Sequence, residues 1–101
     1  MVIKTERFWY TGRWDELSTR LVDLKAYVNE TFSAIEMETM YGLDGERGEF
    51  VLEFRYASLA ELESVEAKMD ADAKYEELLH SMIPYIDMGR GRRDRFFRTV
   101  G

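Results

Sequence analysis

Two stretches of alternating apolar residues, 34–41 and 49–56, flank a segment that contains three glycines and an Asp-Gly pair. Alternation with a period of two is typical of strands that bury one face, and a glycine-rich segment with Asp-Gly is typical of a hairpin turn. This pattern constrains the fold more than any other feature, because it predicts an antiparallel strand pair in the middle of the chain.

Charges set the register of this hairpin. A loop of four residues, 44–47, would place Glu36 opposite Arg55, which is a favourable cross-strand pair. A two-residue turn would instead place Glu36 opposite Glu53. We therefore predict the longer loop. It puts the apolar residues of both strands on one face, which we expect to pack against helices: Ile35, Met37, Phe50, Leu52, Phe54 and Tyr56.

Helices are predicted on both sides of the hairpin. Residues 14–31 carry three leucines and a valine at spacings of four, three and four, which places them on one stripe of a helix. Ser58-Leu59-Ala60-Glu61 is a capping box and predicts the start of a second helix. The stretch 70–72 interrupts that helix and can cap a further helical segment, which Pro84 ends.

Strands are predicted near both ends of the chain, over 2–10 and 93–100, from their β-branched and aromatic residues. The element order is therefore β-α-β-β-α-β, with the second helix split. This is the order of a ferredoxin-like α+β sandwich, in which one four-stranded antiparallel sheet carries its helices on one face. At this length we expect residues 1–101 to form a single domain.

Composition excludes several kinds of function. Asp plus Glu number 20 against 14 for Lys plus Arg, so the formal charge is −6, which disfavours nucleic-acid binding. The chain has no cysteine and one histidine, which excludes cysteine-based and multi-histidine metal sites. It has no signal peptide at its start and no apolar run of the ~20 residues that a membrane span needs. We expect a cytoplasmic protein without metal, cofactor, nucleic-acid partner or membrane contact.

The sheet face opposite the helices is expected to mix large apolar groups with charges. Met40 and Val51 would lie on this face, together with the row of the first strand that holds Phe8 and Tyr10. Its charged residues would be Glu36, Glu38, Glu53 and Arg55. Exposed apolar patches mark interfaces, and two such faces can bury each other about a two-fold axis. We therefore predict a homodimer through this face.

Short stretches of the chain support the same architecture. Residues 54–61 lead from a strand into the capped helix, residues 72–79 begin the second helical segment, and Arg7-Phe8-Trp9 lies in the first strand. In these stretches the chain resembles the NIPSNAP-like members of the dimeric α/β-barrel superfamily, whereas its arginine-rich end, 90–98, departs from them. The resemblance implies the ferredoxin-like fold and the dimer, and it transfers no catalytic residue. Related barrels include cofactor-free monooxygenases and haem-degrading enzymes, whose ligand lies between sheet and helices.

Four residues are candidates for a site between the sheet and the helices. Trp9, Tyr41 and Tyr56 could line a pocket there and hold a flat organic ligand, although their alternating spacing is equally that of core residues. His80 is the only imidazole and therefore the first candidate for a general base. In the haem-degrading relatives a helix histidine in this region ligates iron. The alternative for His80 is an exposed or salt-bridged side chain, since Glu76 precedes it by one helical turn.

Five of the 14 basic residues gather near the end of the chain: Arg90, Arg92, Arg93, Arg95 and Arg98. Arginines in a glycine-flanked loop can hold a phosphate or a carboxylate, and Arg95 is our candidate for that contact. The alternative is that the cluster pairs with the surplus of carboxylates, either within the chain or across the dimer.

These observations leave two functions of different class. The first is a protein that binds an aromatic or isoprenoid-like small molecule between sheet and helices, as a cofactor-free oxygenase or an isomerase. The second is a structural or protein-interaction homodimer without catalysis, in which the aromatic residues are core. A cavity of ~300 Å³ or more between sheet and helices would separate them in favour of the first.

Overall fold

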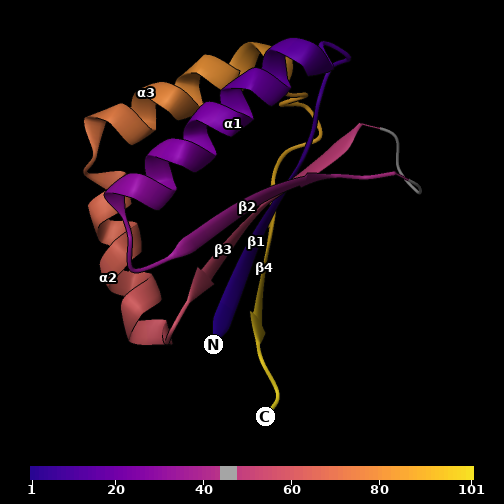
Figure 1. The fold of residues 1–101 in the computed structure, drawn as a ribbon. Helices are drawn as coiled ribbons and strands as arrows, with labels where there is room; N and C mark the ends of the chain where they lie inside the picture. The colour runs from indigo at the N-terminus through magenta and orange to yellow at the C-terminus, as the bar shows by residue number, and fades with distance from the viewer. Residues whose placement is uncertain (44–47) are drawn as a thin grey trace.

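The computed structural model describes residues 1–43 and 48–101 and confirms the predicted order of elements. The elements are β1 Val2–Trp9, α1 Trp14–Thr31, β2 Glu36–Tyr41, β3 Glu49–Tyr56, α2 Leu59–Asp70, α3 Ala73–Met82, the short 3-10 helix η1 Ile83–Tyr85 and β4 Arg93–Arg98. The strands form one antiparallel sheet in the order β2-β3-β1-β4, and the helices lie on one side of it (Figure 1). This is the ferredoxin-like α+β fold. Within the described residues, none of the helices is both long enough and apolar enough to cross a bilayer.

The hairpin of β2 and β3 has the predicted register. Glu36 lies opposite Arg55, and Met37 lies opposite Phe54. The predicted four-residue loop, 44–47, lies outside the described residues. The pairing places the apolar row of both strands towards the helices. The register that pairs Glu36 with Arg55 is therefore also the one that buries the apolar residues.

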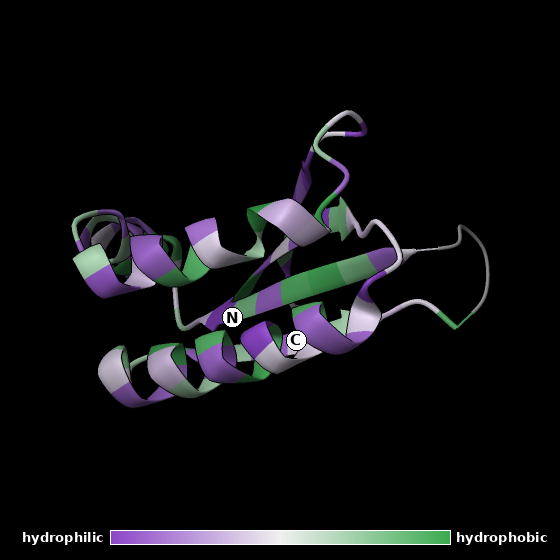
Figure 2. Ribbon diagram, turned by 90° about the horizontal axis from the view of Figure 1, so that it is seen from above, coloured by the Kyte–Doolittle hydropathy of each residue, from purple (hydrophilic) through white to green (hydrophobic). Residues whose placement is uncertain are grey.

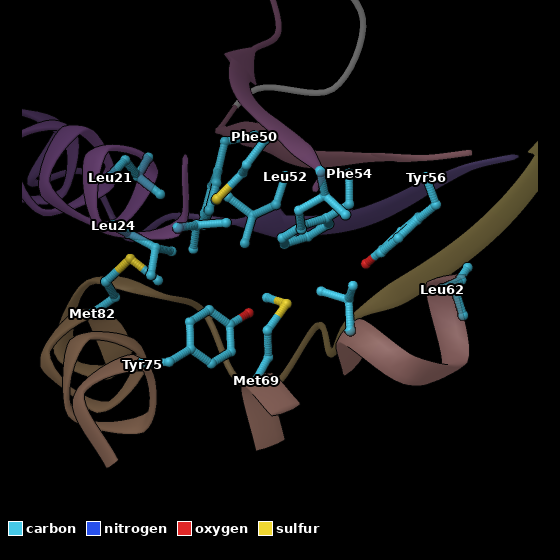
Figure 3. Packing of buried hydrophobic residues seen from close by; sticks show 14 of the residues in the cluster. Leu21, Leu24, Phe50, Leu52, Phe54, Tyr56, Leu62, Met69, Tyr75 and Met82 are labelled. Atoms are coloured by element: carbon cyan, nitrogen blue, oxygen red, sulfur yellow. The ribbon is translucent and has the colours of Figure 1, made fainter. Parts of the chain in front are cut away.

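The core lies between this row and the helices. Each helix in Figure 2 carries both hydrophilic and hydrophobic residues, as amphipathic helices do. The stripe of α1 that was predicted from spacing is buried, and the core side chains of sheet and helices meet in one cluster (Figure 3). Its most buried members are Leu17, Leu24, Val28, Phe50, Leu52, Phe54 and Tyr56.

The two faces of β1 are the reverse of those predicted. Phe8 lies opposite Phe50 and stacks on it with 5.3 Å between ring centroids, so Phe8 faces the helices. Tyr10 packs against Trp14 of α1 at 4.8 Å on the same side. The outer sheet face instead receives the row Ile3, Thr5, Arg7 and Trp9. The expectation of Phe8 and Tyr10 on the outer face was wrong, because pairing with the distant β3 determines which row of β1 is buried.

Side-chain caps begin both segments of the second helical region. The Ser58 hydroxyl accepts a hydrogen bond from the Glu61 amide at 3.1 Å, and the Glu61 carboxylate accepts one from the Ala57 amide at 2.9 Å. Asp72 accepts a hydrogen bond from the Tyr75 amide at 2.8 Å and so starts α3. The predicted break at 70–72 is therefore a second capped start, and it lets α2 and α3 turn relative to each other (Figure 1).

Ser58→Ala is expected to lower the free energy of unfolding by about 1 kcal/mol, because the alanine leaves an amide of the first turn of α2 without its acceptor. Urea denaturation followed by circular dichroism measures the change. Ser64→Ala is the matched control, since Ser64 is exposed within α2. An equal loss in both variants would contradict the capping role.

Candidate functional site

A cavity of about 320 Å³ lies between the helix-facing side of the sheet and the segments α2, α3 and η1. Its walls are largely apolar and include Phe8, Phe54, Met69, Leu79, Met82 and Ile86. The exposed residues Ile83 and Met88 also line it and mark its mouth. The volume reaches the size at which small-molecule sites begin.

Two tyrosine hydroxyls are directed into this space. Figure 3 shows the hydroxyl ends of Tyr56, from β3, and Tyr75, from α3, pointing into the gap between sheet and helices beside Met69. Both side chains are buried and line the cavity. Such a hydroxyl can donate a hydrogen bond to a ligand that is otherwise held by apolar contacts.

The floor of the cavity carries two buried charges, Lys4 and Glu6, on the helix-facing row of β1. The exposed fractions of the two side chains are 9% and 10%. Lys4 Nζ lies 2.6 Å from Glu66 Oε1 on α2 and 3.2 Å from Glu6 Oε2. On the other side of Glu6, Arg92 lies 3.9 Å from its Oε1 and forms a 2.9 Å ion pair with Asp94. Positive and negative side chains thus alternate across the floor of the cavity.

The surroundings of Glu6 and Lys4 shift the pKa values of both side chains. Burial raises the pKa of Glu6 and outweighs the charges of Lys4 and Arg92, which act to lower it. Burial acts to lower the pKa of Lys4, but the hydrogen bond to Glu66 and the charge of Glu6 outweigh it, so the pKa is raised. Lys4 therefore stays a fixed cation, whereas Glu6 is a carboxylate with an increased tendency to accept a proton.

The two tyrosines also have raised pKa values. Burial is the first cause for both, and the charges of nearby carboxylates add to it. The carboxylates are Glu66, Glu6 and Asp70 for Tyr56, and Glu6 and Asp70 for Tyr75. Both hydroxyls therefore remain protonated and act as hydrogen-bond donors.

The structure brings two of the five predicted site residues to this cavity. Tyr56 lines its interior, and His80 lies at its edge. The His80 side chain is 65% exposed and lies 3.8 Å from Glu76 Oε1, which is the surface placement weighed as its alternative. His80 is thus beside the cavity but does not reach the buried charges of its floor.

The other three predicted residues lie elsewhere. Trp9 faces the outer side of the sheet, where it is only 2% exposed, with the guanidinium of Arg90 4.5 Å from its ring. Its placement between sheet and helices was wrong for the same reason as that of Phe8, because the rows of β1 are exchanged. Tyr41 is exposed at the end of β2 and packs on Trp14 at 5.0 Å. Arg95 lies on the outer face, opposite Thr5 and against Phe97.

Sequence reasoning missed the residues that make up the floor. Lys4, Glu6, Glu66 and Arg92 were passed over because charged residues in a short chain are normally exposed. One signal was available: β1 is a central strand in the ferredoxin-like order, so one of its rows must be buried, and both rows contain charged residues. A buried charge was therefore certain in β1.

Charges on the outer sheet face are segregated by strand. Arg7 of β1 lies directly opposite Arg93 of β4, whereas Glu38 of β2 lies directly opposite Glu53 of β3. Like charges opposite each other destabilise a sheet. The face also carries the apolar residues Ile3, Met40, Val51 and Phe97. Its β4 edge is therefore basic and its β2 edge acidic, while β3 carries both Glu53 and Arg55.

Among the described residues, no group of three or more histidine, aspartate or glutamate side chains is placed to hold a metal ion. Glu36, Glu38 and Glu53 share the outer face, and two of them form ion pairs with cations of the chain. Lys25 lies 2.7 Å from Glu38 Oε1, and Arg55 lies 2.6 Å from Glu53 Oε1.

Comparison with known proteins places this architecture. No family profile and no curated protein matches the sequence. Among solved structures, an uncharacterized NIPSNAP domain protein from Burkholderia xenovorans superposes with a TM-score of 0.82 at 13% identity, over 100% of this chain and 96% of that one. The chain shares the fold of this NIPSNAP domain protein.

Other structures that superpose on this chain carry names that refer to chemistry. A putative antibiotic biosynthesis monooxygenase from Caulobacter crescentus superposes with a TM-score of 0.78 at 14% identity, over 99% of this chain and 90% of that one. SnoaB, a cofactor-independent oxygenase from Streptomyces nogalater, superposes in a mutant form with a TM-score of 0.73 at 10% identity, over 99% and 93% of the two chains. At these identities the likeness establishes the fold.

Proposed function

We propose that the protein binds a small, largely apolar organic molecule in the cavity and that Glu6 removes a proton from it. The observation that carries the proposal is the position of Glu6. It is a buried carboxylate with a raised pKa, on the floor of a cavity of about 320 Å³ with apolar walls. A general base is most effective when its pKa approaches the working pH, and burial is the usual means of raising a carboxylate.

The proposed step is proton abstraction. A C–H or O–H bond of the ligand breaks, its electron pair stays on the ligand, and the proton goes to the Glu6 carboxylate. Lys4 and Arg92 lie on either side of Glu6 and stay close to the negative charge as it moves. In an isomerase the proton returns to another atom, whereas in a cofactor-independent oxygenase the ligand anion reacts with dioxygen. The fold shared with SnoaB supports the second course.

A homodimer through the outer sheet face is the second part of the proposal. The distribution of charge favours it, because the arginines of β4 in one copy are complementary to the glutamates of β2 in another. The cavity lies on the other side of the sheet, so binding and dimerisation use different surfaces. If the cavity test below fails, a homodimer without catalysis is the function that remains.

Hydrogen–deuterium exchange on β-tetralone tests the proton abstraction. This neutral bicyclic ketone has an acidic C–H, and the protein in heavy water is expected to accelerate its deuteration at least about tenfold over buffer. Glu6→Gln is expected to return the rate to the buffer value, since the amide has no basic oxygen. Mass spectrometry of the ketone measures both rates.

Two controls make this result specific to the cavity. Glu63→Gln removes an exposed carboxylate from α2 and is expected to leave the exchange unchanged. Ile83→Trp at the mouth of the cavity is expected to slow the exchange by excluding the ketone, whereas Ala26→Trp on the exposed side of α1 is not. Equal exchange with the native protein and Glu6→Gln would refute the role of Glu6.

A further inference from the structure

We infer that the cavity selects neutral ligands that can form hydrogen bonds and rejects carboxylates and phosphates. The inference rests on the proposed function, because it names the substrate class of the same cavity. It follows from the balance of charges in the lining, from how the cations of the lining are engaged, and from the response of the two buried hydroxyls.

Carboxylates outnumber cations in the lining of the cavity. Lys4 and Arg92 are its two cations, while Glu6, Glu66 and Asp70 are its carboxylates. An anionic ligand would therefore enter a space that already carries an excess of negative charge. In a partly desolvated site such repulsion is screened far less than at a surface.

Both cations are already engaged by carboxylates of the chain. Lys4 lies 2.6 Å from Glu66 and 3.2 Å from Glu6, at the bottom of the site. Arg92 forms its 2.9 Å contact with Asp94 and also faces Glu6. A ligand carboxylate would have to compete with these partners. If it displaced Glu6 from Lys4, it would leave a buried carboxylate without its nearest cation, which is costly.

The remaining titratable side chain of the lining does not reverse this balance. His80 lies at the edge of the cavity, and its imidazole already faces Glu76. The imidazole is 65% exposed, so it lies in solvent and not among the buried charges of the floor.

Tyr56 and Tyr75 lie close to the same carboxylates. Their hydroxyls point into the cavity, and the surrounding carboxylates add to burial in raising the pKa of both. The phenolate form, a negative charge at these positions, is thus opposed by the same groups that an anionic ligand would meet. A neutral hydroxyl or carbonyl group instead finds hydrogen-bonding partners there.

The selection is consistent with proton abstraction. When Glu6 takes a proton from a neutral ligand, one negative charge moves from the carboxylate to the ligand, and the total charge of the site is unchanged. A ligand that arrives as an anion adds a second negative charge, and its deprotonation would put two negative charges on the ligand. The geometry therefore favours substrates that become anions only inside the cavity.

Naphthamide and naphthoate test the inference, because they have the same shape and differ in charge. We expect the native protein to bind naphthamide at least about tenfold more tightly than naphthoate, as measured by calorimetry at neutral pH. Glu66→Gln, which removes one carboxylate and leaves Lys4 less engaged, is expected to narrow this ratio several-fold. Glu63→Gln, outside the cavity, is expected to leave it unchanged. Added salt is expected to strengthen only the binding of naphthoate.

Naphthoate binding as tight as that of naphthamide would overturn the inference, and so would binding of neither compound. The proposed function is judged separately by the exchange of β-tetralone. Exchange that depends on Glu6, together with tight binding of naphthoate, would keep the base and reject the charge selection. Loss of both results would reject the function as well.

Discussion

Lys4→Met is expected to lower the free energy of unfolding by roughly 3–5 kcal/mol at about neutral pH, because it leaves the buried carboxylate of Glu6 without its nearest cation. Glu66 also loses a partner, but its side chain is 31% exposed and can be hydrated. Methionine retains most of the apolar length of lysine, so the loss reports the charge. Urea denaturation measures it, and Lys68→Met on the exposed side of α2 is the control.

This loss is expected to depend on pH. Because burial raises the pKa of Glu6, its folded form binds a proton more tightly than the unfolded chain does, and the associated stabilisation disappears as the pH rises through the folded pKa. Without Lys4 that pKa rises further, so the penalty is small near pH 4, where Glu6 is protonated, and complete only above its folded pKa. Lys4→Met combined with Glu6→Gln is expected to recover most of the stability. A loss that is independent of pH would contradict this account.

The helix caps and the β2–β3 hairpin could be predicted from the sequence, because each depends on residues in one element or in two consecutive elements. The register of β2 and β3 follows from Glu36 and Arg55, which are joined by one hairpin. The caps at Ser58 and Asp72 follow from the side chains themselves. In each case the residue types that form the contact are neighbours in sequence or separated by one short loop.

The faces of β1 could not be predicted in the same way. Its two rows, Val2-Lys4-Glu6-Phe8 and Ile3-Thr5-Arg7-Trp9, each mix apolar and charged residues, so their hydropathy does not distinguish inside from outside. The choice is made by pairing with β3, about 50 residues away along the chain. Because the wrong row of β1 was assigned to the core, Trp9 was expected in the pocket, and the burial of Lys4 and Glu6 was not foreseen. This single error accounts for most of the site residues that were not predicted.

The arginines near the end of the chain lie on two opposite sides of the sheet, which composition does not reveal. Arg92 precedes β4 and turns to the cavity, where it meets Glu6, whereas Arg93 and Arg95 lie on the outer face. The guanidinium of Arg93 lies 5.6 Å from the ring of Trp9. The cluster thus serves two surfaces on opposite sides of the sheet. It cannot be assigned one role as a unit.

The outer-face arginines give the second large prediction. Face-to-face packing about a two-fold axis parallel to the strands would set β4 of one copy against β2 of the other. Arg95 would then lie level with Glu38 of the second copy, with Arg93 and Glu36 two residues away on opposite sides, and each contact would occur twice. The native protein is expected to sediment at about twice 12.0 kDa at micromolar concentration.

Reversing either half of the face is expected to weaken this dimer on the order of a hundredfold or more, since like charges across an interface cost several kcal/mol. Arg93→Glu with Arg95→Glu makes the β4 edge of the face acidic, and Glu36→Lys with Glu38→Lys makes its β2 edge basic. Sedimentation velocity is expected to show each double variant as a monomer. Circular dichroism checks that both still fold.

Mixing the two double variants gives the decisive outcome. In the heterodimer the acidic β4 of the first variant meets the basic β2 of the second, and the unchanged β2 of the first meets the unchanged β4 of the second. An equimolar mixture is therefore expected to form a heterodimer of nearly native affinity. If the substitutions only destabilised the fold, mixing would not restore the dimer. If the arginine cluster served only to bind an anion, each variant alone would remain dimeric.

A mixture that stays monomeric would show that these charges do not face each other. Native protein that stays monomeric at high concentration and low salt would exclude the dimer. Recovery that appears only on mixing, and declines with added salt, would identify the opposed halves of the outer face as the contact between the two copies.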